Sequence, residues 1–153
     1  MIELTKASIT ISAPVEIVFT YVSNMENYKH WFPGVIDINS YNNLAHGVVG
    51  KKYKETLLLP DGEAELIIEV DQCEDNRLFI TKGNLVGVLP RMSLIFSVDH
   101  EKNCHVSLQF HSRNAELTET SDIIIALRQD LTSRAKVGLT TLKEILHTNR
   151  KLN

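Results

Sequence analysis

The sequence of 153 residues is poor in the features that mark several classes of protein. It has only two cysteines, Cys73 and Cys104, which form neither a CxxC pair nor a Cys/His cluster, so we expect no disulfide framework and no metal site. The formal net charge is −3 and the basic residues are scattered, which argues against a nucleic-acid partner. No apolar run approaches the roughly 18–20 residues that span a bilayer, and the N-terminus lacks the apolar core of a signal peptide. We therefore expect a cytoplasmic protein with reduced thiols and no stable membrane insertion.

Repeats, low-complexity tracts and linkers are also missing, which favours a single domain over residues 1–153. No cofactor-binding motif stands out, and no Ser-His-Asp or Cys-His set can be argued, because the sequence does not show which of these residues meet. We therefore expect no cofactor and assign no catalytic residue, apart from the candidate acid Glu55 discussed below. The oligomeric state stays open.

What the sequence does contain is a clear order of elements. Residues 7–11 alternate apolar and polar side chains, which predicts a half-buried strand. Pro14 suits the first turn of a helix, and two short helices are expected before Pro33-Gly34. Alternation returns from Val35 to Arg113 and is interrupted by turn signals such as Pro60-Asp61-Gly62, which predicts about six further strands with one solvated face.

The chain closes with a predicted helix over about residues 121–147. Apolar residues recur there every three or four positions and form one continuous stripe. Gly138 lies inside this stripe, where it costs about 1 kcal/mol relative to alanine, so we expect it to make room for a close contact or for a ligand. A sheet with one apolar face and one helix to cover it must curve around that helix, and this shape favours an internal cavity.

Two stretches near the N-terminus resemble the opening of a known superfamily. They are ITISAPVEIVF at residues 9–19 and SNMENYKHWFPGV at residues 23–35. Both are similar to the START-like (SRPBCC) superfamily, which includes polyketide cyclase/dehydrase, lipid-transport and birch-pollen-allergen-type proteins. The resemblance implies an α+β helix-grip fold, in which an antiparallel sheet of about seven strands wraps a long C-terminal helix around an apolar cavity. It implies a small hydrophobic ligand but carries no substrate-specific signature.

Several residues are candidates to contact such a ligand. Tyr28 and Trp31 could stack on it at the cavity mouth, or they could anchor the short helices against the rest of the fold. Because Lys52 and Lys54 should face water, Tyr53 and Glu55 should point inward. A carboxyl group in an apolar cavity would have a raised pKa and could orient a ligand or transfer a proton; alternatively, a twist or bulge lets Glu55 reach solvent.

Two further features have competing interpretations. His105 and His111 lie six residues apart on one strand, too far for joint metal ligation, so a solvated face is expected. The apolar run Leu85–Pro90 predicts either a mobile lid or lip, or simply the start of the next strand.

The favoured hypothesis is the binding or transport of a small hydrophobic molecule, such as a lipid, polyketide or quinone, without catalysis. One alternative is a polyketide cyclase or dehydratase that uses Glu55 or a histidine for proton transfer. Another is a protein-interaction module with a collapsed cavity, in which the apolar run at 85–89 meets a partner. The full set of candidate ligand-binding residues is Tyr28, Trp31, Tyr53, Glu55, Leu66, Ile68, Leu94, Phe96, Leu108, Phe110, Leu131, Gly138 and Leu142.

Overall fold

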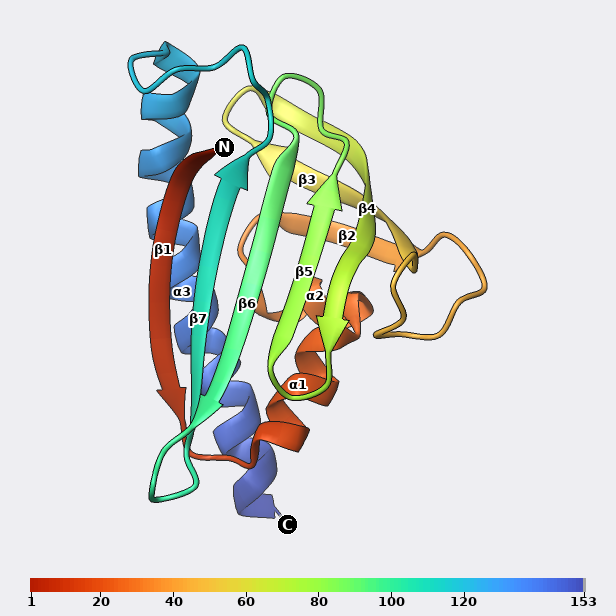
Figure 1. Ribbon diagram of the computed structural model, residues 1–153, viewed down its shortest axis with the longest axis vertical. Coiled ribbons are helices and arrows are strands. Elements are labelled where there is room, and N and C mark those ends of the chain that lie inside the picture. The colour runs from red at the N-terminus through yellow and green to blue at the C-terminus, as the bar shows by residue number, and fades with distance from the viewer. Residues whose placement is uncertain (153) are drawn as a thin grey trace.

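Seven antiparallel strands form one curved sheet that wraps around a long C-terminal helix (Figure 1). The computed structural model describes the backbone of residues 1–152 and the side chains of residues 1–147. The strands are β1 (Ile2–Ile11), β2 (Val35–Ser40), β3 (Lys52–Leu59), β4 (Gly62–Glu74), β5 (Leu78–Gly83), β6 (Pro90–Val98) and β7 (Cys104–Ser112). The helices are α1 (Val15–Ser23), the 3-10 turn η1 (Met25–Asn27), α2 (Tyr28–Trp31) and α3 (Asp122–Leu152). This architecture is the predicted one.

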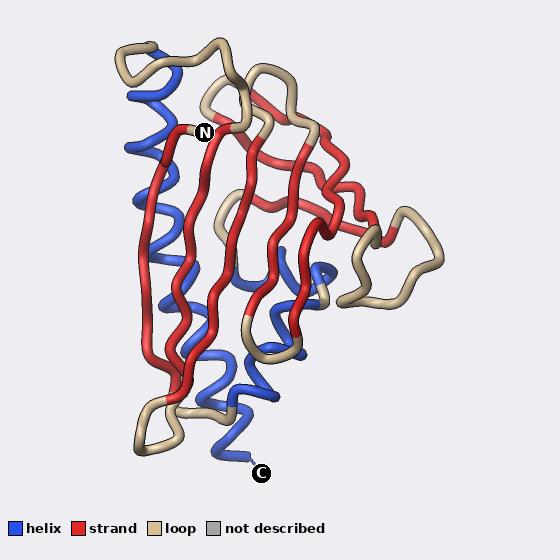
Figure 2. Tube along the Cα trace, in the orientation of Figure 1, coloured by secondary structure: helices blue, strands red, loops and turns tan. Residues whose placement is uncertain are grey.

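The strand order is β1-β7-β6-β5-β4-β3-β2, so only β1 and β7 are neighbours that are distant in the chain. In Figure 1 the strands β1, β7 and β6 lie in front of α3, while β2 and β3 run at a steep angle to them. Figure 2 shows that the loops β3–β4, β5–β6 and β7–α3 gather at one end of the molecule. The inner face of the sheet therefore meets α3, and the outer face is open to solvent.

Local sequence accounts for the start and end of the short helices. Pro14 lies at the N-cap of α1, one residue earlier in the helix than expected, and its missing N–H group costs nothing there. After α2, Gly34 turns the chain into β2 with a φ of +89°, a conformation that glycine adopts without steric cost. The buried side chains of this connection include Met25, Tyr28 and Trp31.

The C-terminal helix α3 begins close to the predicted position and continues beyond His147. Its apolar stripe is buried at Ile124, Ala135, Leu139 and Leu142. Among the residues that the structure describes, no helix is both long and apolar enough to cross a membrane.

Most of the apolar run at 85–90 forms the loop between β5 and β6. Strand β6 begins only at Pro90, and the preceding residues form turns with positive φ at Gly87 and Leu89. The interpretation of the whole run as the start of a strand is therefore wrong, because these turns interrupt the ladder between β5 and β6.

Candidate functional site

A cavity lies between the inner face of the sheet and the first half of α3. It contains about 710 Å³ of empty space, including the part open to solvent at its mouth, and about 80 Å³ of this admits the centre of a water molecule. Its walls are mostly apolar and come from β1, η1, α2, strands β3 to β6, the β5–β6 loop, β7 and α3. The lining residues are Leu4, Met25, Tyr28, Phe32, Glu55, Leu57, Leu59, Leu66, Ile68, Thr81, Gly83, Leu85, Val88, Pro90, Met92, Phe110, Leu127, Asp130, Leu131 and Arg134.

Glu55 places a carboxyl group in this apolar wall. Its neighbours Lys52 and Lys54 point outward and form ion pairs with Glu69 and Glu65 on β4, so the alternation of β3 turns Glu55 inward. The alternative expectation, that a twist or bulge lets Glu55 reach solvent, is wrong, because the residue is buried. Its side chain is only 3% exposed, and no residue that the structure describes hydrogen-bonds its carboxyl group. Burial raises the pKa of Glu55 to about 7, and the opposing effect of the Arg134 charge is smaller.

Tyr28 is the second polar group in the wall. It is 4% exposed, and its ring stacks on Phe32 with centroids 5.0 Å apart. Burial, reinforced by the charge of Glu55, raises its pKa well above the usual value, so the hydroxyl stays protonated. Within the described part of the chain, this hydroxyl has no hydrogen-bond partner. Two buried oxygen groups therefore line an apolar cavity without partners of their own.

Arg134 closes one side of the cavity. Its Nε lies 3.0 Å from the Asp130 carboxylate one turn earlier on α3, its Nη2 donates to the Leu58 carbonyl at 2.7 Å, and its Nη1 donates to the Pro33 carbonyl at 3.2 Å. One guanidinium group thus joins α3 to β3 and to the turn after α2. A Cβ at position 34 would overlap Nη1 of Arg134, so a larger residue there would displace this guanidinium group, and the positive φ also favours glycine.

The β5–β6 loop forms part of the cavity rim. Leu85 and Val88 contribute to the lining, whereas the side chain of Val86 is 91% exposed. The loop is tied to the segment after β7: the Leu89 carbonyl accepts from the backbone N–H of residue 113, and the Gly87 carbonyl accepts from the side chain of Asn114.

Six of the predicted ligand-binding residues lie in the cavity wall, and seven lie elsewhere. The six are Tyr28, Glu55, Leu66, Ile68, Phe110 and Leu131. The seven outside the lining are Trp31, Tyr53, Leu94, Phe96, Leu108, Gly138 and Leu142.

Packing explains the positions of the residues outside the lining. Trp31 packs edge-on against Tyr28, and Gly138 brings α3 close to Phe32 and the Trp31 carbonyl. The Tyr53 hydroxyl is used in a 2.6 Å hydrogen bond with Nδ1 of His46. Leu94, Leu108 and Leu142 are fully buried in the core, and Phe96 packs edge-on against Phe19. Alternation predicts that these side chains point inward, but not where along the strand the space remains unfilled.

Sequence reasoning missed Arg134 and Asp130. Their spacing of four on a helix was a usable signal for an ion pair, and they flank Leu131 on the apolar stripe. Of the two histidines considered for metal binding, His105 lies on the solvated face: its Nε2 pairs with Asp99 at 3.2 Å and its Nδ1 with the Thr10 hydroxyl at 2.7 Å. His111 is partly buried, and its Nδ1 forms no hydrogen bond with a described residue. Among the described residues, no group of three potential ligands could hold a metal ion.

Known proteins match the chain in structure rather than in sequence. No protein-family model matches it, and no curated protein matches it in a sequence search. A START superfamily protein from Mycobacterium smegmatis matches with a TM-score of 0.73 and 10% identity, over 94% of this chain and 97% of that one. The structure of Ara h 8.0201 matches with a TM-score of 0.67 and 11% identity, over 94% of this chain and 97% of that one.

The di-domain ARO/CYC StfQ from the steffimycin biosynthetic pathway also matches, with a TM-score of 0.73 and 13% identity. This match covers 96% of the present chain but 51% of StfQ, so the chain spans about half of that protein. The seven-stranded sheet, the two short helices after β1 and the long C-terminal helix thus give this chain the helix-grip fold of the START-like superfamily, as the resemblance in residues 9–35 predicted.

Proposed function

We propose that this protein binds a small hydrophobic molecule, of the lipid, polyketide or quinone type, in the cavity between the sheet and α3, and that it carries or sequesters this molecule without making or breaking bonds. The observation that carries the proposal is the cavity itself, whose walls are apolar except at a few positions. Its fold neighbours include a START superfamily protein and an ARO/CYC, which supports a ligand of this kind.

Binding would be driven by the burial of apolar ligand surface, at about 25 cal/mol per Å². The two unpartnered polar groups would set the orientation. The Tyr28 hydroxyl is a hydrogen-bond donor, and Glu55, with a pKa of about 7, is present in both protonated and ionised forms near neutral pH. An oxygen group on the ligand would satisfy both.

Native mass spectrometry of the purified protein, before and after organic extraction, tests the proposal. We expect an additional mass that disappears on extraction and returns when the extract is added back. Glu55→Gln should change the affinity modestly, because glutamine keeps the shape and a hydrogen-bonding capacity. A protein that carries no extractable molecule and takes up none would contradict the proposal.

The Glu55 carboxyl also favours a second candidate function, that of a cyclase or dehydratase. A general acid or base works best when its pKa lies near the working pH, and the pKa of Glu55 is about 7. In that case Glu55→Gln would abolish turnover of a polyketide-like substrate while binding is retained. Equal activity of both proteins would exclude Glu55 as the proton-transfer group.

A further inference from the structure

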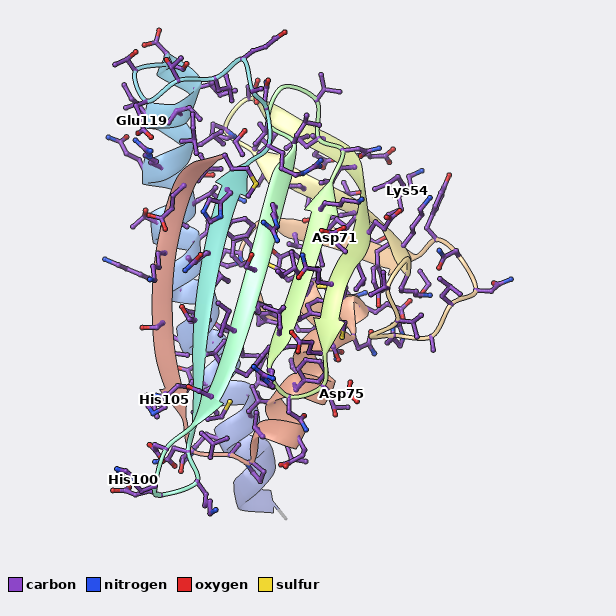
Figure 3. The ribbon with its side chains drawn as sticks, viewed as in Figure 1. Lys54, Asp71, Asp75, His100, His105 and Glu119 are labelled. Carbon is purple, nitrogen blue, oxygen red and sulfur yellow. The ribbon has the colours of Figure 1, made fainter. Side chains whose placement is uncertain are left out.

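The outer face of the sheet is turned toward the viewer in Figure 3. The cross-strand register places a row of charged side chains across six strands of this face. The cross-strand register pairs Lys52 on β3 with Glu69 on β4, and Glu69 with Lys82 on β5. Lys82 is in turn opposite Arg91 on β6, and Arg91 is opposite His111 on β7. The charges alternate at first, and Glu69 lies 3.7 Å from Lys52 and 3.5 Å from Lys82. From Lys82 the row continues with Arg91 and His111, and it ends on β1 with Glu3 opposite His111. Like charges opposite one another destabilise a sheet, so this end of the row needs an explanation.

Two arginines distinguish this end of the row from the rest of the protein. Of the five arginines with described side chains, Arg77, Arg128 and Arg134 each lie within 4 Å of a carboxylate. Arg91 and Arg113 have no carboxylate at that distance within the described part of the chain. A protein with a formal net charge of −3 has acidic residues to spare, yet none is placed against these two guanidinium groups.

Arg91, His111 and Arg113 lie together. Arg91 is directly opposite His111. Arg113 follows His111 by two residues, one position past the end of β7, and continued alternation would place it on the same outer face. Opposite and diagonal neighbours on a sheet lie within reach of long side chains. Arg113 is held in place, since its backbone N–H donates to the Leu89 carbonyl and its Nη2 donates to the Gly83 carbonyl of β5.

All three side chains are partly buried, and each has a nitrogen that is shielded from solvent. Nε of Arg91, Nε of Arg113 and Nδ1 of His111 are buried and form no hydrogen bond with any described residue. The shielded nitrogens lose hydration, and of these three side chains only that of Arg113 forms a hydrogen bond with a described residue, through its Nη2. Two guanidinium nitrogens and one imidazole nitrogen are therefore open to hydrogen bonding by a ligand.

We propose that Arg91, His111 and Arg113 form a binding site for a phosphate group on the outer face of the sheet, separate from the cavity. A phosphate monoester carries a charge of about −1.5 to −2 at neutral pH and three acceptor oxygens, which matches two guanidinium charges and an imidazole. A carboxylate would neutralise only one of the two arginines. Guanidinium groups bind phosphate oxygens through paired N–H donors, which lysine cannot do.

The test is a titration of the full chain with inorganic phosphate at constant ionic strength, followed by NMR of the histidine ring signals. We expect a saturable shift of the His111 signals and none for His100, which lies in the turn between β6 and β7. Arg91→Gln and Arg113→Gln should each weaken binding about tenfold or more, since each removes charge-assisted hydrogen bonds. Arg91→Lys, which keeps the charge and is less disruptive to the fold, should also weaken it.

Matched controls separate this site from general charge effects. Arg77→Gln removes an arginine that is paired with Glu74, and it should leave phosphate binding unchanged. Glu55→Gln should do the same, so a failure of the cavity hypothesis would not affect this result. The absence of a saturable His111 shift, or an equal loss of binding in Arg77→Gln, would overturn the proposal.

Sedimentation with vesicles identifies the source of the phosphate. Binding to phosphatidic acid vesicles but not to phosphatidylcholine vesicles, lost in Arg91→Gln and Arg113→Gln, would indicate a lipid headgroup. Saturable binding of inorganic phosphate without vesicle binding would indicate a soluble phosphorylated molecule. Vesicle binding that is insensitive to both substitutions, together with an unresponsive His111, would contradict the site in either form.

Discussion

Glu55→Gln provides a quantitative test of the buried carboxyl group, independent of any ligand. Burial raises the pKa of Glu55 from 4.5 to about 7 in the folded protein, whereas in the unfolded chain the carboxyl titrates near 4.5. Between these values the unfolded chain gives up a proton that the folded protein keeps. Stability from this group is therefore fully present below pH 4.5 and is lost as the pH rises to about 7. Each pH unit in this window corresponds to about 1.4 kcal/mol, so the loss is about 3 kcal/mol.

Urea unfolding from pH 4 to pH 8.5 measures this effect. The free energy of unfolding of the unmodified protein should fall relative to that of Glu55→Gln by about 3 kcal/mol, or roughly 6–12 °C in Tm for a chain of this size. Glu65→Gln is the matched control, because Glu65 is an exposed carboxylate on the neighbouring strand and pairs with Lys54. Parallel pH profiles for the unmodified protein and Glu55→Gln would refute the reasoning.

Three further substitutions test the contacts around the cavity. Gly34→Ala should lower the free energy of unfolding more than Gly47→Ala does. Both glycines have a positive φ, where alanine costs about 1–2 kcal/mol of backbone strain. Only at Gly34 would the added Cβ also displace the guanidinium group of Arg134. Equal losses in urea unfolding would contradict this. Arg134→Gln should lower the free energy of unfolding by about 1–3 kcal/mol, since it removes hydrogen bonds to two backbone carbonyl groups. It should also raise the pKa of Glu55 further, because the Arg134 charge lowers that pKa. NMR of the Glu55 carboxyl carbon measures this pKa, and a lowered value would contradict the prediction. Val86→Asp should change the free energy of unfolding by less than about 0.5 kcal/mol, because its side chain is 91% exposed, and a larger loss in thermal unfolding would show that the loop packs differently.

The sequence contains most of the information for the fold, because its patterns repeat over long segments. The alternation around Val106, Leu108 and Phe110 identifies a strand with one buried face, and the spacing from Ile124 to Leu142 identifies the long helix. The run at 85–90 left two interpretations open, since apolar residues occur both in strands and at the rim of a cavity. Only the backbone turns at Gly87 and Leu89 decide between them.

The site was harder to predict than the fold. The alternation of side chains along β3 places Glu55 on the inner face of the sheet. Leu94 and Leu108 also point inward, but they belong to the filled part of the core. Whether an inward side chain lines a cavity depends on what α1 and α3 place opposite it, which is a property of tertiary packing. The same holds for Arg134, whose contacts with Pro33 and Leu58 join segments that are far apart in the chain.

The most direct test of the ligand cavity is methyl NMR of the extracted protein titrated with a long-chain fatty acid and with a naphthoquinone. We expect saturable shifts for at least one probe at Leu66, Ile68 and Leu131, which line the cavity. Leu94 and Leu108 are fully buried but lie outside the lining, and they should shift much less. The absence of saturable shifts with both probes, or shifts that are no larger at the lining residues than at Leu94 and Leu108, would contradict the account.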